Sequence, residues 1–218
     1  MRVDTIVQPT SEPVISDDVK ENAVIRTDDD DAFIDRTITI ARQMIEDYAK
    51  ISMMPQTKQV VIRRYELEHH PHPELYFFIY PVPGQYRTYL PRPPIVEITE
   101  VDQTSISEDG TTEVTETLDP TMYYLEGEEI VLNIENIDPT VRYFTATYTT
   151  GYDSADDVPM QLKQAIIIAA SDHYDNRTSF ALSPTVKQLC APFRRQRIMS
   201  NVARGSSGNL ASYNDYYY

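Results

Sequence analysis

The chain has 218 residues, of which 41% are hydrophobic, 15 are proline and 6 are glycine, so it suits one domain with extensions and long irregular segments. Nineteen basic against 34 acidic residues give a formal net charge of −15, which makes tight general binding to nucleic-acid phosphates unfavourable. The single cysteine, Cys190, excludes an internal disulfide, fits a reducing compartment and is expected to be a small buried side chain.

The N-terminal residues predict an arm and no targeting segment. Residues 1–13 carry two prolines and little periodicity, so we expect an arm that orders only against another surface. The first four residues start no signal peptide, and no window approaches the roughly 18–20 apolar residues of a membrane span. We therefore expect a soluble protein that is not exported by this route and has no membrane partner.

Two helices are predicted before the middle of the chain. The first covers residues 15–24, with Ser16 as its cap and two aspartates in its positive first turn. The second follows four aspartates, 28–31, and runs to about residue 51. The acidic run lacks the glycine and terminal glutamate of an EF-hand, so we assign it to capping and to the helix dipole. Apolar residues of the second helix recur at steps of four, three, four and three: Ile34, Ile38, Ala41, Ile45 and Tyr48.

The middle of the chain, residues 55–151, changes to β-branched and aromatic runs broken by turn residues, which predicts about six strands. A hairpin turn is predicted at 107–111, where Gly110 is free to take a positive φ. The alternation over 141–148 indicates a strand with both faces partly covered. The six runs are 60–68, 74–82, 94–104, 113–118, 128–135 and 141–152.

Helical periodicity returns at Val158-Pro159 and continues to about residue 177. Because Ile167 and Ile168 make its centre apolar nearly all round, this helix should be wrapped by other helices or by neighbouring subunits. His173 lies on its apolar face and is expected to be a core or interface histidine. One face of this helix consists of Val158, Leu162, Ala165, Ile166, Ala169, Ala170 and His173.

A last helix is predicted after Ser183-Pro184 and ends in a basic run, which suits the negative end of a helix dipole. Its face consists of Val186, Leu189, Cys190 and Phe193, and the basic run is Arg194, Arg195 and Arg197. Beyond Asn201 there is no periodicity and four tyrosines stand among the last six residues, so we expect a tail that is disordered until bound.

These elements predict an α+β fold, a helical bundle from the N- and C-terminal helices with a β-rich insertion in the middle. The expected organisation is an arm over residues 1–13, one domain over 14–198 and a flexible tyrosine-rich tail over 199–218. Within the domain, the helices occupy about 15–52 and 158–197 and the β-rich insertion occupies about 56–151.

The candidate chemical motifs are weak. His69, His70 and His72 supply metal-ligand types, but prolines 71 and 73 force extended backbone and no second cluster converges on them, which favours an exposed loop. Glu66 and Glu68 share a strand face as a glycosidase pair would, yet such pairs arise by chance among 34 acids. We expect no enzyme, metal or cofactor, and keep an acidic metal-dependent hydrolase as the alternative from another class.

Four sequence blocks resemble the head-tail connector family of tailed bacteriophages, the small adaptors placed below the portal. They are DDDDAFIDRTITIARQMIEDY at 28–48, TYLPRPPIVEI at 88–98, YTTGY with the helix that follows at 148–177, and LCAPFR at 189–194. The blocks keep the family's order and spacing, and the resemblance covers about residues 14–198. Residues 66–86 and the tail after 199 depart from it and inherit no role.

The resemblance implies a virion structural protein at the neck, present in the host cytoplasm during assembly, that forms a closed ring, usually of twelve subunits. The ring would dock on the portal protein on one side and on a stopper or tail completion protein on the other, and genomic DNA would pass its acidic bore without specific binding. The alternatives are another neck component, a stopper or tail terminator, which the 158–177 block argues against, and a DNA-contacting packaging factor, whose basic surface only residues 194–204 offer.

Two sets of residues follow from this interpretation. We expect the apolar helix to contact neighbouring subunits, and we expect the tail to order on the portal because tyrosines give large contact area at low entropy cost. The subunit interface would use Leu162, Ile166, Ile167, Ile168 and Tyr174. The portal-docking tail would use Leu210, Tyr213, Asn214, Tyr216, Tyr217 and Tyr218.

Overall fold

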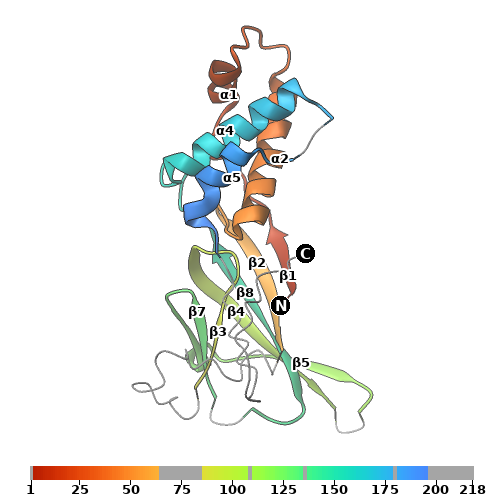
Figure 1. Ribbon diagram of the computed structural model, residues 1–218. Coiled ribbons are helices and arrows are strands. Elements are labelled where there is room, and N and C mark those ends of the chain that lie inside the picture. Colours follow the sequence, from red (N-terminus) through yellow and green to blue (C-terminus); the bar gives the residue numbers. More distant parts are fainter. Residues whose placement is uncertain (1, 64–84, 108–109, 135–136, 179–180, 196–218) are drawn as a thin grey trace, which may run out of the picture.

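The computed structural model describes residues 2–63, 85–107, 110–134, 137–178 and 181–195 (Figure 1). Its helices lie at one end of the molecule and its strands at the other, as the α+β prediction requires. The helical layer holds α1 (Ser16–Ala23), α2 (Asp31–Ala49), α4 (Met160–Asp175), α5 (Pro184–Cys190) and the short η2 (Ala191–Phe193). The β layer holds β1 (Arg2–Val7), β2 (Gln56–Arg63), β3 (Gln85–Tyr89), β4 (Ile95–Ile106), β5 (Glu113–Thr117), η1 (Pro120–Met122), β6 (Tyr123–Glu126), β7 (Glu129–Asn133) and β8 (Val141–Thr150).

The helical layer has its own hydrophobic core. The apolar stripe predicted for α2 is buried at Ile34, Ile38 and Ile45, each at 1% exposure or less, and it packs against α4. Burial of one such side chain contributes about 1.5–3 kcal/mol. Helix α4 also contacts α1 and α5, and Val186 and Cys190 of α5 close the core from the C-terminal side. The N- and C-terminal helices therefore form one bundle.

The acidic run before α2 acts differently from the prediction. Asp30, the residue preceding the helix, makes no side-chain cap; it accepts a hydrogen bond from the Tyr174 hydroxyl at 2.6 Å. The Lys20 ammonium pairs with Asp28 at 2.8 Å and also with Asp31. Capping was thus the wrong assignment, because these acids join α2 to α1 and α4. Asp31 does lie in the first turn, where a negative charge suits the helix dipole.

The start of α1 also departs from the prediction, because Ser16 is not its cap. The helix begins at Ser16, preceded by Ile15 in extended conformation. The N–H of Ile15 donates to the Asp18 carboxylate at 3.0 Å, so an acid inside the first turn satisfies the backbone N–H of the residue before the helix, as the third helical residue does in a capping box.

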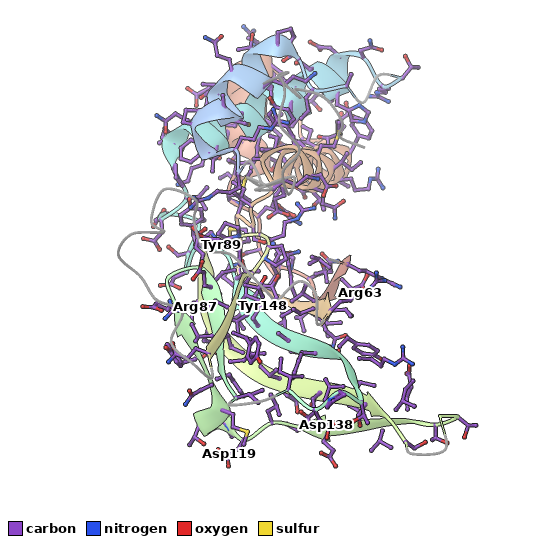
Figure 2. The ribbon with its side chains drawn as sticks, turned by 60° about the horizontal axis from the view of Figure 1, so that its bottom comes forward. Arg63, Arg87, Tyr89, Asp119, Asp138 and Tyr148 are labelled. Atoms are coloured by element: carbon purple, nitrogen blue, oxygen red, sulfur yellow. The ribbon has the colours of Figure 1, made fainter. Side chains whose placement is uncertain are left out.

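The strands form a five-stranded antiparallel sheet in the order β1-β2-β8-β4-β5 and a three-stranded sheet in the order β3-β7-β6. Side chains from both sheets make a second core, among them Ile62, Phe144, Ile130 and Leu132, all fully buried. Tyr148 lies between the strands of the two sheets (Figure 2). From Tyr143 onward, the even-numbered side chains of β8 are buried and the odd-numbered ones are half-buried, which confirms a strand covered in part on both faces.

The structure corrects the prediction for the N-terminal arm. Residues expected to order only against another surface instead form β1, which pairs with β2 in register Val3 with Val60 and Thr5 with Lys58. Most side chains of β1 are exposed, so the hydrophobic alternation that predicts a strand from sequence is weak there. Strands β3 and β6 were missed as well, and the predicted run at 74–82 lies outside the described residues.

The turn between β4 and β5 agrees with the prediction. Gly110 has φ +72°, and its N–H donates to the oxygen of Ser107 at 2.8 Å. Within the described ranges, no helix combines the length and the apolar character that crossing a bilayer demands.

Candidate functional site: the junction and the exposed surfaces

A tight turn joins the helical layer to the β layer, and it is the Leu-Pro-Arg-Pro-Pro block of the sequence. At its centre Arg92 takes a positive φ of 68°, which is uncommon for a residue with a side chain. Its guanidinium donates to the main-chain oxygen of Glu46 at 2.6 Å and pairs with the Asp47 carboxylate. Both acceptors lie in the last turn of α2, where a cation is stabilised by the helix dipole.

The end of β8 is hydrogen-bonded to the same turn. The Tyr148 hydroxyl donates to the oxygen of Pro91 at 2.7 Å, and the Thr150 hydroxyl donates to the oxygen of Pro94 at 2.7 Å. The N–H of Gly151 also donates to Pro94, at 2.9 Å. We call residues 46–56, 90–94 and 148–152 the junction.

Gly151 shows how closely the junction is packed. Its φ is +114°, and a Cβ atom there would lie 2.2 Å from the main-chain oxygen of Met54. The neighbouring oxygen belongs to the backbone, which cannot rotate away as a flexible side chain can. No other residue type fits this position without displacing the connection from α2 to β2.

A buried ionic group is centred on Glu46 of the junction. The Glu46 carboxylate accepts from the N–H of Met53 at 2.6 Å, from Gln56 at 3.1 Å and from Arg42 at 2.9 Å. Arg42 in turn binds Glu12 at 2.6 Å, which ties the segment before α1 to α2. Burial raises the pKa of Glu46, although the Arg42 guanidinium opposes this. Removing one partner of such a group typically costs about 3–5 kcal/mol.

On the surface beside the junction there is an open depression of about 250 Å³. Its wall includes the last described residues of the chain, and its cations are already engaged: Arg195 pairs with Glu128 and Arg194 lies 5.0 Å from the centre of the Tyr48 ring. The junction depression, as we name it, is lined by Ile51, Pro93, Pro94, Tyr152, Pro192, Phe193, Arg194 and Arg195.

The predicted subunit-interface residues divide into two groups. Leu162 and Ile166 are fully buried in the core of their own chain, so they are core residues and leave the predicted interface. Ile167, Ile168 and Tyr174 are half-buried against that core. Helices of the same chain therefore wrap most of α4, and its apolar character alone does not require neighbouring subunits.

The other candidate residues are not brought together into a site within the described part of the chain. The tail residues Leu210 to Tyr218, the histidines at 69, 70 and 72, and the acids at 66 and 68 lie outside the described residues. His173 is buried, with its ring centre 6.1 Å from that of Phe33. Cys190 is buried as expected, and burial raises the pKa of its thiol to about 11, so the nucleophilic thiolate is scarce at neutral pH. In the described part of the chain, no three His, Cys, Asp or Glu side chains are grouped to hold a metal ion.

Comparisons with solved structures find the same fold in the necks of phage-like particles. A chain from the neck of an empty gene transfer agent particle, computed with C6 symmetry, matches with a TM-score of 0.66 at 14% identity. A chain from the virion of the native particle gives 0.64 at 14%, and one from the native neck, computed with C12 symmetry, gives 0.60 at 16%. Each match covers 92% of this chain and 98% of the other. No family model and no curated protein matches the chain.

Proposed function

We propose that the chain is a neck component of a tailed phage or phage-like particle, the ring adaptor between the portal and the tail. The observation that carries this proposal is the fold likeness to neck chains over nearly the whole length of both partners. The four sequence blocks support it independently, since they resemble the adaptor family in the same order. The role is structural: the ring completes the DNA-filled head, and no catalytic step is proposed.

The two-layer architecture suits a connecting part. An adaptor must hold different partners at its two ends, and here the ends are built from separate cores joined by a hydrogen-bonded junction. The Arg92 contacts to α2 and the hydroxyl contacts from β8 fix the angle between the ends. A fixed angle in each subunit is what a closed ring needs, because angular errors accumulate around the ring.

For the ring itself, we propose twelve copies in head-to-tail contact. The half-buried Ile167, Ile168 and Tyr174 of α4 are the proposed subunit contacts, and the fully buried Leu162 and Ile166 are no longer included. A cyclic assembly uses two different surfaces of each copy, so these residues would meet a surface other than themselves.

The acidic bore is proposed to lie on the β layer. Along β4, Glu97, Glu100 and Asp102 stand opposite three threonines of β8, and directly opposite residues share a face of the sheet. Glu97 and Glu100 are exposed. Such a face would repel DNA phosphates and let the genome pass without adhesion.

Electron microscopy of the purified chain mixed with portal protein tests the function. We expect closed rings bound to the portal, in which the helical and β layers of each subunit repeat around the ring axis. Rings that bind only the tail tube would mean a tail terminator, and rings that bind only beneath an already assembled adaptor would mean a stopper. Either result overturns the adaptor assignment, and a chain that binds no neck protein overturns the neck assignment as well.

A further inference from the structure

The junction depression is a surface feature that the connecting role leaves unexplained, and its volume limits the size of the group that it can hold. At about 250 Å³ it is smaller than the roughly 300–1,000 Å³ of small-molecule sites. It is larger than a packing defect, since one water occupies about 30 Å³. The volume suits one or two protein side chains.

The lining specifies the chemistry of those side chains. Three prolines and the rings of Tyr152 and Phe193 offer flat apolar surfaces on which an aromatic ring can stack. Two guanidinium groups stand beside them, and Arg195 keeps 58% of its side chain exposed despite its ion pair with Glu128. A tyrosine fits this lining, because its ring can stack between the apolar walls and its polar hydroxyl can lie next to an arginine.

The tyrosine-rich C-terminal tail continues from the wall of the depression. The chain leaves the described structure just after Arg195, and Tyr213 follows 18 positions later, 213 minus 195. Eighteen residues reach up to about 60 Å, so return to the depression needs no stretching. Because the tail is tethered, its effective concentration at the depression is about 1 mM, far above the concentration of tails from other copies in a micromolar solution.

We propose that in the free subunit a tyrosine of residues 213–218 docks in the junction depression of its own chain. Asp215 lies within this segment and brings a negative charge toward Arg194 and Arg195. The docked segment stores the tail against the subunit before assembly. The proposal concerns the free chain and stands or falls separately from the neck role.

The absence of tryptophan from the sequence gives a direct test. Phe193→Trp places a single fluorescent reporter in the depression. We expect the full chain to show blue-shifted emission and several-fold weaker iodide quenching than the same variant ended after Asn201. A peptide of residues 210–218 added to the shortened variant should restore the blue shift saturably, and a peptide with its tyrosines replaced by serine should not.

Controls keep the outcome decisive. Replacing Tyr213, Tyr216, Tyr217 and Tyr218 by serine in the full chain should mimic the shortening, whereas Tyr124→Ser, at an exposed tyrosine of β6, should leave the reporter unchanged. Pro192→Trp, at an exposed position of the same wall, serves if Phe193→Trp fails to fold. Equal quenching of full and shortened chains with both reporters overturns the proposal. Protection that disappears on dilution means that the tail of a second copy occupies the site, and it also overturns the proposal.

Discussion

The guanidinium of Arg92 donates to the main-chain oxygen of Glu46 at 2.6 Å, across 46 positions of sequence. This contact adds a charged donor to a carbonyl that already accepts from the N–H groups of Lys50 and Ile51 at the end of α2, and it holds the β layer to the helical layer. Hydrogen bonds to charged groups contribute about 1.5–3 kcal/mol. We therefore expect Arg92→Ala to lower the free energy of unfolding by about 2 kcal/mol in urea titration.

Two matched variants separate the contact from the backbone. Arg92→Lys keeps the charge but loses the second donor, and should fall between wild type and alanine. Arg92→Gly removes the contact while relieving the positive φ, so it should cost less than alanine. Equal stability of Arg92→Ala and wild type would show that the contact contributes nothing.

Among substitutions of the described glycines by alanine, Gly151→Ala should be the most damaging. The new Cβ would meet the Met54 oxygen at 2.2 Å at a backbone angle that alanine also disfavours, which predicts a loss of about 3 kcal/mol or more. Gly110→Ala is the control, because φ is also positive there but nothing lies within 4 Å. It should cost only about 1–2 kcal/mol. Thermal unfolding of the two variants measures this difference, and similar melting temperatures would contradict close packing at the junction.

Stability should depend on pH through Glu46. Burial raises the pKa of this carboxyl in the folded state above its unfolded value near 4.5, so between the two values the folded chain binds more protons than the unfolded chain. The contribution is present below the unfolded pKa and is lost as pH rises through the folded pKa. Glu46→Gln removes this dependence, so wild type should lose stability relative to the variant as pH rises from the unfolded pKa of the carboxyl through its raised folded pKa. A stability difference that stays constant with pH would refute the buried-carboxyl account.

The proposed ring contacts make a separate prediction. Ile167→Gln and Ile168→Gln should convert rings to monomers in light scattering while leaving a folded chain, because both side chains are only half-buried. Leu162→Ala should instead destabilise the monomer by about 2–5 kcal/mol, as expected for a fully buried leucine. Intact rings in both glutamine variants would remove this face of α4 from the interface.

The tail carries the proposed portal contact. A chain ended after Asn201 should keep its circular dichroism spectrum, because the described cores lie before this point, yet lose binding to portal protein. Substituting serine at the tail tyrosines in the full chain should have the same effect on binding. Unchanged portal affinity would show that the portal contact lies elsewhere.

Local patterns predicted most helices and strands but few of the contacts between them. The stripe from Ile34 to Ile45 and the turn at Gly110 depend on neighbours in sequence, so periodicity and turn chemistry sufficed. Asp30 looked like a cap because its partner, Tyr174, lies 144 positions away. The apolar centre of α4 showed that the helix is covered, but the sequence alone did not distinguish coverage by the same chain from coverage by another copy.

The junction was present in the sequence only as a motif. The Leu-Pro-Arg-Pro-Pro block stood out by resemblance, yet neither the Glu46 acceptor nor the Gly151 packing follows from it, since both depend on how α2 and β8 meet. A polar residue inside an amphipathic helix, such as Glu46, reads as solvent-exposed unless the partner layer is known.

The hydrophobic clusters of the two layers share no buried residue. Substitutions that reshape one cluster therefore leave the other with its own packing intact, provided the connecting hydrogen bonds persist. The sequence of each layer can then change separately, and chimeras that exchange one whole layer should fold wherever the Arg92 turn, Gly151 and the end of α2 are taken together.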